Sequence, residues 1–243
     1  MHEPWQPVLA LLETSLAPAG IDLVAPMQVG WYNRHEPQSI HLPEPGGPGS
    51  LAVLIGNSVA MWEPFLLGVC DQPSLLEGHH PLDSWVEQRV LAAVVGLDAQ
   101  PSSIHWVNGP GSRSFSMQRA AVATGLVGMA PCRLTIHREL GLWFGLRAVL
   151  VFDLEGPAEP DWTAPFPCAS CATRPCLPLL ERALGRTTRG AAPPPMMGVR
   201  GNWGPWLAMR DACPHGREHR YGELQIAYHY SKQRRYLLEA LGN

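Results

Sequence analysis

Four cysteines in the C-terminal third of the sequence have the spacing of metal ligands. The segment "PCASCATRPCLP" places Cys168, Cys171 and Cys176 in the pattern C-x2-C-x4-C, and Cys213 follows in "ACPHG". Thiolates two residues apart on a turn can hold one metal, and a cysteine followed by proline is common among iron–sulfur ligands. The pattern therefore predicts a metal site formed by these four residues.

Three interpretations of the four cysteines stay open: a four-iron iron–sulfur cluster, a structural zinc site, and thiols that bind no metal. The segment is similar to the opening of ferredoxin-type sequences with the pattern "CxxCxxxPC". It lacks their C-x3-C-P completion, which the pair Cys213-Pro214 could supply from a distance. An iron–sulfur cluster is the interpretation that we favour from the sequence.

Other cysteines and histidines are less informative. His215, His219 and His229 lie near the last cysteine of the group, where one of them could replace a thiolate. We favour a solvated or capping role for all three. Cys70 and Cys132 have apolar neighbours in the sequence, so we expect both in the hydrophobic core.

A second chemical feature is one cation inside an apolar run. Residues 142–152, "LWFGLRAVLVF", read as a strand with Arg147 near the middle. Period two places Phe144 and Leu146 on one apolar face and Arg147 beside Val149 on the other. A run that is apolar on both faces is typical of a strand covered on both sides.

The buried arginine requires an anionic partner. A guanidinium cannot lose its charge, and burying it unpaired costs several kcal/mol. The partner of Arg147 is either an Asp or Glu of the chain itself or the carboxylate or phosphate of a ligand held by the guanidinium fork. The neighbouring Gly145 favours a ligand, because a missing side chain in a strand often lets a flat group approach the backbone.

The elements that would position these groups follow an α+β pattern. We expect helices over residues 5–16, from about Ser58, and over 82–96, 115–130 and 221–241. We expect strands over 27–33 and 51–56, and a hairpin formed by 132–137 and 142–152. We interpret residues 1–155 as the body of the fold, and 156–243 as a Pro/Cys-rich extension packed on it, with an irregular segment at 190–206.

Composition limits the classes of function. The chain has 243 residues, of which 46% are hydrophobic and 16% charged, and its formal net charge is −3. This charge gives no electrostatic reason to expect nucleic acid or an anionic membrane as a partner. No apolar run reaches the roughly 18 residues needed to span a bilayer. The start "MHEPWQPVLALLETSL" lacks the features of a signal peptide, so we expect a cytoplasmic protein.

Several stretches resemble a known family. "QVGWYN", "IHLPEPG" and "LAVLIGNSVAMWEPFL" look like the start of the CblC-type cobalamin-processing proteins, the MMACHC family. "IHRELGLWFGLRAVLVF" is similar to the family's "IHPxFGxWFxxR" segment, and "MRDACPHGREHRYGELQIAYHYSKQRR" to its "YRDAxTPxERYxxEQxAYxxxxxQR" pattern. The spacings agree almost without gaps from about residue 27 to 150.

The resemblance implies a nitroreductase-like fold, with an antiparallel sheet flanked by helices, that binds cobalamin and acts as an enzyme on its upper axial ligand. Alkyl groups would pass to the thiolate of glutathione or another small thiol. Cyanide would be lost reductively with electrons from a reduced flavin. The residues that match the family's thiol-binding arginines are Arg147, Arg210 and Arg234, and Arg235 is the alternative match at the third position.

The resemblance also implies a cobalamin-binding surface. The matching residues are Trp31, Tyr32, Gln118, Val122, Trp143, Phe144, Gly145 and Leu146. Val122 stands where the family carries a histidine close to the cobalamin, so no histidine ligand is expected at that point. The four aromatic residues of the set could form the floor of a corrin pocket, but core packing is the more common use of such side chains.

Two other functions stay open. In one, cobalamin and an iron–sulfur cluster act together on another substrate, as in epoxyqueuosine reductase. In the other, the chain is a non-catalytic cobalamin chaperone. The sequence also leaves open whether flavin binds and whether the chain forms a homodimer.

Overall fold

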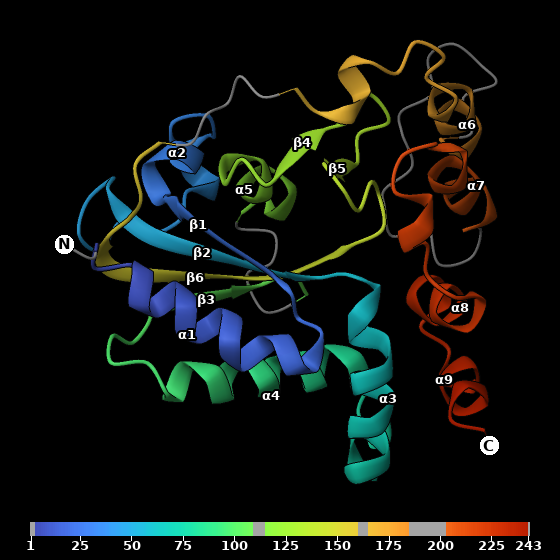
Figure 1. Cartoon of the computed structure of the whole chain (residues 1–243), viewed down its shortest axis with the longest axis horizontal. Coiled ribbons are helices and arrows are strands. Elements are labelled where there is room, and N and C mark those ends of the chain that lie inside the picture. The colour runs from blue at the N-terminus through green and yellow to red at the C-terminus, as the bar shows by residue number, and fades with distance from the viewer. Residues whose placement is uncertain (1–2, 109–114, 160–164, 185–202, 243) are drawn as a thin grey trace. The chain divides into compact units, whose positions relative to one another are not determined.

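The computed structural model describes residues 3–108, 115–159, 165–184 and 203–242 (Figure 1). The chain divides into two units, which are described separately below. The first unit comprises Met1–Val127 and Phe144–Ala164, and the second comprises Gly128–Trp143 and Pro165–Asn243. Residues 190–202 of the irregular segment expected from the sequence lie outside the described ranges.

The first unit is built on a four-stranded antiparallel sheet. Its order is β1 (Leu23–Gln28), β2 (Ser50–Asn57), β6 (Gly145–Glu155) and β3 (Ser103–Trp106). Every residue of β2 is buried, as are residues 147–152 of β6. The two central strands are therefore covered on both faces, which confirms the prediction from their apolar composition.

Helices cover both faces of this sheet (Figure 1). The helices α1 (Gln6–Leu16) and α4 (Pro81–Val95) lie on one face, and α2 (Val29–Asn33) and α5 (Met117–Ala123) lie on the other. A further helix, α3 (Trp62–Asp71), follows β2 through a short turn. Short 3-10 helices in the two units are η1 (Ala17–Ala19), η2 (Gln38–Ile40), η3 (Val59–Met61), η4 (Pro73–Glu77), η5 (Pro167–Ala169) and η7 (Arg217–His219).

A β-bulge interrupts the pairing of β2 with β6. Ile55 pairs with Ala148, but the next residue, Gly56, pairs with Leu146. Arg147 is therefore the extra residue on β6, and a bulge of this kind changes the direction of side chains on the strand.

The bulge changes which β6 residues share a face. Phe144 and Leu146 pack against the same core cluster as Val149 and Val151. The prediction of one uninterrupted alternation along this strand, with Phe144 and Leu146 opposite Val149, is therefore wrong.

The second unit consists of a small two-stranded sheet and four helices among its described residues. The strands are β4 (Val127–Met129) and β5 (Thr135–His137). The helices are α6 (Cys176–Ala183), α7 (Gly204–Ala212), α8 (Glu223–Ser231) and α9 (Arg234–Ala240). A separate core joins the small sheet to α6 and α7, with Ile136 and Leu142 packed against Leu180 and Met209.

Several predicted elements are confirmed. The structure has helices at 6–16 and 81–95, and a buried strand at 50–57. Ser58 caps the turn that follows this strand, because its side chain accepts a hydrogen bond from the backbone N–H of Ala60 at 3.1 Å.

Other predicted elements are wrong. Strand β5 pairs with β4 and not with β6, and the expected hairpin is reduced to an isolated bridge between His137 and Gly141. Residues 29–33 are helical, and the helix expected over 115–130 ends at Ala123, shortly before Gly125 with φ +73°. The expected last helix is broken at Lys232, which has φ +58° and lies between α8 and α9. Strand β3 was not expected from the sequence.

Candidate functional site

Arg147 has partners inside the protein. Its Nε atom donates to Oδ1 of the buried Asn57 at 2.6 Å, and its Nη1 atom lies 3.5 Å from Oδ1 of Asp83. The Arg147 side chain is 8% exposed and that of Asp83 is 22% exposed. Of the two partners considered from the sequence, the structure contains the internal carboxylate.

The space left by Gly145 is filled by the same residues. A Cβ atom at this position would lie 2.8 Å from Oδ1 of Asn57 and 3.1 Å from Nη2 of Arg147. The missing side chain therefore makes room for the Asn57–Arg147 pair. The prediction that a flat ligand approaches the backbone at Gly145 gains no support from this packing and stays a prediction.

A cavity of about 240 Å³ lies beside Arg147, at the start of α4. Its lining includes Asp83, Glu87 and Asn108, and Asn108 Nδ2 donates to Asp83 at 3.0 Å. The volume is below the usual size of a drug-sized ligand site, about 300–1,000 Å³, and two carboxylates line it. Neither property suits a corrin or an anionic ligand.

Part of the predicted cobalamin surface lies around α5 and the beginning of β6. Val122, Phe144 and Leu146 are half-buried and pack on the core of the first unit. Gln118, one helical turn before Val122, is also half-buried. These side chains retain exposed surface of mixed but mainly apolar character, which suits a large, flat and largely apolar group.

The other aromatic candidates of the first unit belong to the core. Trp31 is 4% exposed and Tyr32 is 2% exposed. The Tyr32 hydroxyl donates to the carbonyl of Ile40 at 3.0 Å and accepts from the backbone N–H of Ser116 at 2.8 Å. Burial raises the pKa of Tyr32. Both residues therefore follow the core-packing alternative.

In the second unit, Arg210 covers the predicted cobalamin residue Trp143. The guanidinium lies 4.3 Å from the centre of the Trp143 ring, and Trp143 is 1% exposed. Arg210 also donates to the carbonyl oxygen of Leu142 and, at 3.4 Å, to the hydroxyl of Tyr230. These contacts hold Arg210 against an aromatic core.

The third predicted thiol-binding residue, Arg234, is exposed at the start of α9. Of the three predicted arginines it has the most accessible side chain, since Arg147 is buried and Arg210 is half-buried. An exposed guanidinium at this place can pair with a solvated carboxylate.

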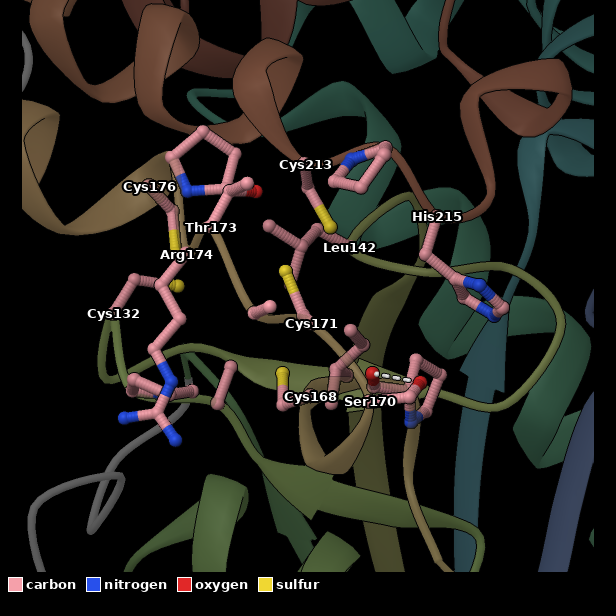
Figure 2. Close-up of a pocket in the computed structure, with 17 residues that line it drawn as sticks. Cys132, Leu142, Cys168, Ser170, Cys171, Thr173, Arg174, Cys176, Cys213 and His215 are labelled. Carbon is pink, nitrogen blue, oxygen red and sulfur yellow. Dashed lines mark hydrogen bonds between the residues drawn. The ribbon is translucent and has the colours of Figure 1, made fainter.

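The four predicted metal-binding cysteines line one cavity of the second unit. Its volume is about 420 Å³, and Cys132 and His215 also line it. Figure 2 shows the sulfur atoms of Cys171 and Cys213 pointing toward each other, with the Cys176 thiol beside Cys132. The ring of His215 contacts the carbonyl oxygen of Arg138 through Nε2.

The thiols of this cavity affect one another. The pKa of Cys132 is raised to about 12, chiefly by burial and also by the neighbouring Cys176 and Cys168. Burial also raises the pKa values of Cys168 and Cys213, to which nearby cysteines contribute. The backbone N–H of His215 and the cation of Arg217 act in the opposite direction on the pKa of Cys213.

The structure shows whether side chains are arranged to bind a single metal ion. Among the described residues, no group of three or more His, Cys, Asp or Glu side chains is arranged to hold a metal ion. All six cysteines are free thiols. This finding therefore supports neither the zinc nor the iron–sulfur prediction in the described part of the chain.

Cys132 and Cys70, the two cysteines that are not among the four predicted metal ligands, differ in their burial. Cys132 is buried as expected, but it also lines the thiol cavity, which sequence spacing did not indicate. Cys70 is exposed on α3, so the prediction that it lies in the core is wrong. Apolar sequence neighbours do not distinguish these cases, because α3 has an exposed face as well as a buried one.

The described helices and strands define an α+β fold with a four-stranded antiparallel sheet of the CblC type. A solved structure of a C. elegans B12-trafficking protein, CblC, a human MMACHC homologue, is similar to this chain with a TM-score of 0.72. The sequence identity is 18%, and the similarity covers 97% of this chain and 96% of that chain. No protein-family model and no curated protein matches the sequence.

Within the described ranges, no helix has both the length and the apolar character needed to cross a membrane.

Proposed function

We propose that this chain binds cobalamin and removes or reduces its upper axial ligand. The observation that carries the proposal is the similarity to a B12-trafficking protein over nearly the full length of both chains. The half-buried surface formed by Val122, Phe144 and Leu146 supports it, because it offers apolar contact to a flat macrocycle.

The proposed reactions are those implied by the sequence resemblance. In dealkylation, the thiolate of glutathione or a similar thiol attacks the alkyl carbon bound to cobalt. A carbon–sulfur bond forms, the cobalt–carbon bond breaks, and its electron pair stays on cobalt, which gives cob(I)alamin and a thioether. The protein would contribute orientation of the two reactants. For cyanide removal, a reduced flavin is the proposed electron donor.

The arginine candidates are not equivalent in this proposal. We assign the carboxylates of the thiol to Arg234 first, because its side chain is exposed. Arg210 can contribute only by giving up its contacts with Leu142 and Tyr230. Arg147 would have to exchange Asp83 and Asn57 for a ligand, so we assign it a structural role.

A cobalamin titration tests binding. Addition of methylcobalamin or hydroxocobalamin to the purified chain should shift the visible spectrum toward the form in which the lower base has left cobalt. Size-exclusion chromatography should then show the coloured ligand together with the protein. An unchanged spectrum and complete separation of ligand from protein would contradict the proposal.

Turnover separates the enzyme from a carrier. Anaerobic incubation with methylcobalamin and glutathione should give cob(I)alamin and S-methylglutathione, detected by absorption and mass spectrometry. Replacement of Arg234 by Ala should raise the KM for glutathione and leave cobalamin affinity unchanged, whereas Arg89→Ala, at an exposed position of α4, serves as control. Binding without product would favour the chaperone function.

We further propose a nitroreductase-like fold, a cytoplasmic location, flavin binding and a homodimer for this chain. The thiol cavity favours one alternative function, a cobalamin-dependent reductase of another substrate that also uses an iron–sulfur cluster. Flavin fluorescence and light scattering of the purified chain test flavin binding and oligomeric state directly.

A further inference from the structure

The second unit contains a cavity with five thiols, and we propose that it binds a four-iron iron–sulfur cluster. The iron ligands are Cys168, Cys171, Cys176 and Cys213. Cys132, which is absent from the sequence pattern, does not bind iron but donates a hydrogen bond to the sulfur of Cys176. This site is independent of cobalamin binding and goes beyond the function proposed above.

The cysteines reach the cavity from separate parts of the second unit. Cys132 lies between β4 and β5, Cys168 in η5, Cys176 at the start of α6 and Cys213 directly after α7. Cys171 lies between η5 and α6, and the sulfur atoms are gathered around the same cavity (Figure 2). The fold thus brings together thiols that are remote in sequence, as a cluster with four ligands requires.

The arrangement suits a cluster better than a single ion. Zinc–sulfur bonds measure about 2.3 Å, so four thiolates around one zinc ion must lie within about 4 Å of each other. No group of the described His, Cys, Asp and Glu side chains can hold one ion in this way. In a four-iron cluster each thiolate binds a different iron, so the sulfurs stand further apart around a larger body. The cavity of about 420 Å³ provides space between them.

Positive charge and backbone donors surround the thiols. Arg174 lines the cavity, and Arg217 is close enough to Cys213 to act on its charge. The backbone N–H of His215 donates to the sulfur of Cys213. Cations and N–H donors stabilise thiolates and tune iron–sulfur clusters, and four thiolates would bring four negative charges into the cavity.

The turns that carry the cysteines are strained. Arg133, next to Cys132, has φ +65°, and Arg174, two residues before Cys176, has φ +41°. Non-glycine residues rarely adopt positive φ, and such strain is concentrated at functional sites. The strain is consistent with turns whose conformation places the thiols at the cavity at a cost in backbone conformational energy.

The positions of Cys176 and Cys132 in the fold decide which of the two is assigned as the iron ligand. Cys176 is the first residue of α6, where the helix N-terminus favours a thiolate. Cys132 is 1% exposed, and its thiol is within hydrogen-bonding distance of Cys176. A thiolate at Cys176 accepts this bond, and hydrogen bonds to ligand sulfurs raise the reduction potential of a cluster because they stabilise its more negative reduced state.

The test is anaerobic reconstitution of the full chain with equal amounts of ferrous and ferric iron and with sulfide, without cobalamin. The wild-type protein should contain about four iron and about four acid-labile sulfide per chain and absorb at about 400 nm. Ala and Ser substitutions of each proposed ligand should lose most of the iron. Cys70→Ala, a change of an exposed cysteine outside the cavity, should retain it.

Cys132→Ala tests the proposed hydrogen bond from Cys132 to the sulfur of Cys176. It should keep the iron content of the wild type, and its reduction midpoint should fall in a titration with dithionite as the one-electron source. One zinc ion per chain, or wild-type protein that takes up no iron and sulfide, would overturn the cluster. Iron loss in Cys132→Ala with retention in Cys176→Ala would overturn the ligand assignment. Circular dichroism of each variant shows whether the loss of iron results from unfolding. If a variant unfolds, the iron and sulfide content of the wild-type protein still tests whether the cluster is present.

Discussion

Arg147 Nη1 lies 3.5 Å from Oδ1 of Asp83, so a strand cation and a helix carboxylate form an ion pair inside the first unit. Asn57 completes the arrangement by accepting from Arg147 Nε. The cation therefore joins the central strand β6 to α4, and its presence in an apolar strand has a structural explanation that requires no ligand.

The first prediction concerns this ion pair. Arg147→Met and Asp83→Asn should each lower the free energy of unfolding by about 1–2 kcal/mol, because each leaves a polar partner only partly satisfied. The double variant should be less destabilised than the sum of the two, with a coupling energy of about 1 kcal/mol. Urea unfolding followed by tryptophan fluorescence measures all three.

Asp71→Asn is the matched control, since Asp71 is exposed at the end of α3. It should change stability by less than about 0.5 kcal/mol. If Arg147→Met left stability unchanged but abolished glutathione-dependent turnover, the ligand interpretation of Arg147 would be correct and the structural one wrong.

The second prediction concerns the space at Gly145. In Gly145→Ala the new methyl group would lie 2.8 Å from Asn57 Oδ1, so the Asn57–Arg147 hydrogen bond must shift. We expect a loss of about 1–3 kcal/mol in the free energy of unfolding. Gly204→Ala is the control, because no atom lies within 4 Å of the added methyl group there. Equal stability of the two variants would contradict this packing argument.

The third prediction concerns the proposed cobalamin surface. Val122→Asp places a carboxylate on the half-buried face of α5, and desolvating this charge under a corrin should weaken cobalamin affinity about tenfold or more. Val95→Asp provides the same change at a position that is 81% exposed on α4. Isothermal titration with hydroxocobalamin should separate the two variants. Similar affinities for both would exclude the α5 surface from the binding site.

The fourth prediction concerns pH. Burial lowers the pKa of His105, which contacts Ser103 Oγ at 2.9 Å and the ring of Phe115. The unfolded chain therefore binds a proton more readily than the folded one. Stability from this histidine is present above the unfolded pKa of about 6.5 and is lost as pH falls below it.

Urea midpoints at pH 7.5 and 5.5 measure this effect. His105→Phe should reduce the pH dependence of the midpoint, whereas His79→Gln, at an exposed position, should leave it as in the wild type. A pH dependence that is the same in His105→Phe and the wild type would assign the effect to other groups.

The resemblance of short sequence stretches to CblC proteins agrees with the structural similarity at 18% identity. Local patterns predicted the buried strand β2 and the helix α4, and local spacing singled out three of the cysteines that line the cavity of the second unit. Each of these features depends on residues that are close in sequence. Local patterns did not predict that β5 pairs with β4, because strand pairing depends on contacts between separate segments.

The sequence by itself determined that Arg147 stands in a doubly covered strand and requires an anion, because apolar composition and a permanent charge are properties of the residues. Only the tertiary structure decided that a bulge turns this arginine toward Asp83 and that Asn57 fills the space beside Gly145. The same holds for Cys132, whose place among the other thiols depends on the folding of distant turns around one cavity. Partners of this kind are chosen by packing over long sequence separations, and local spacing does not encode them.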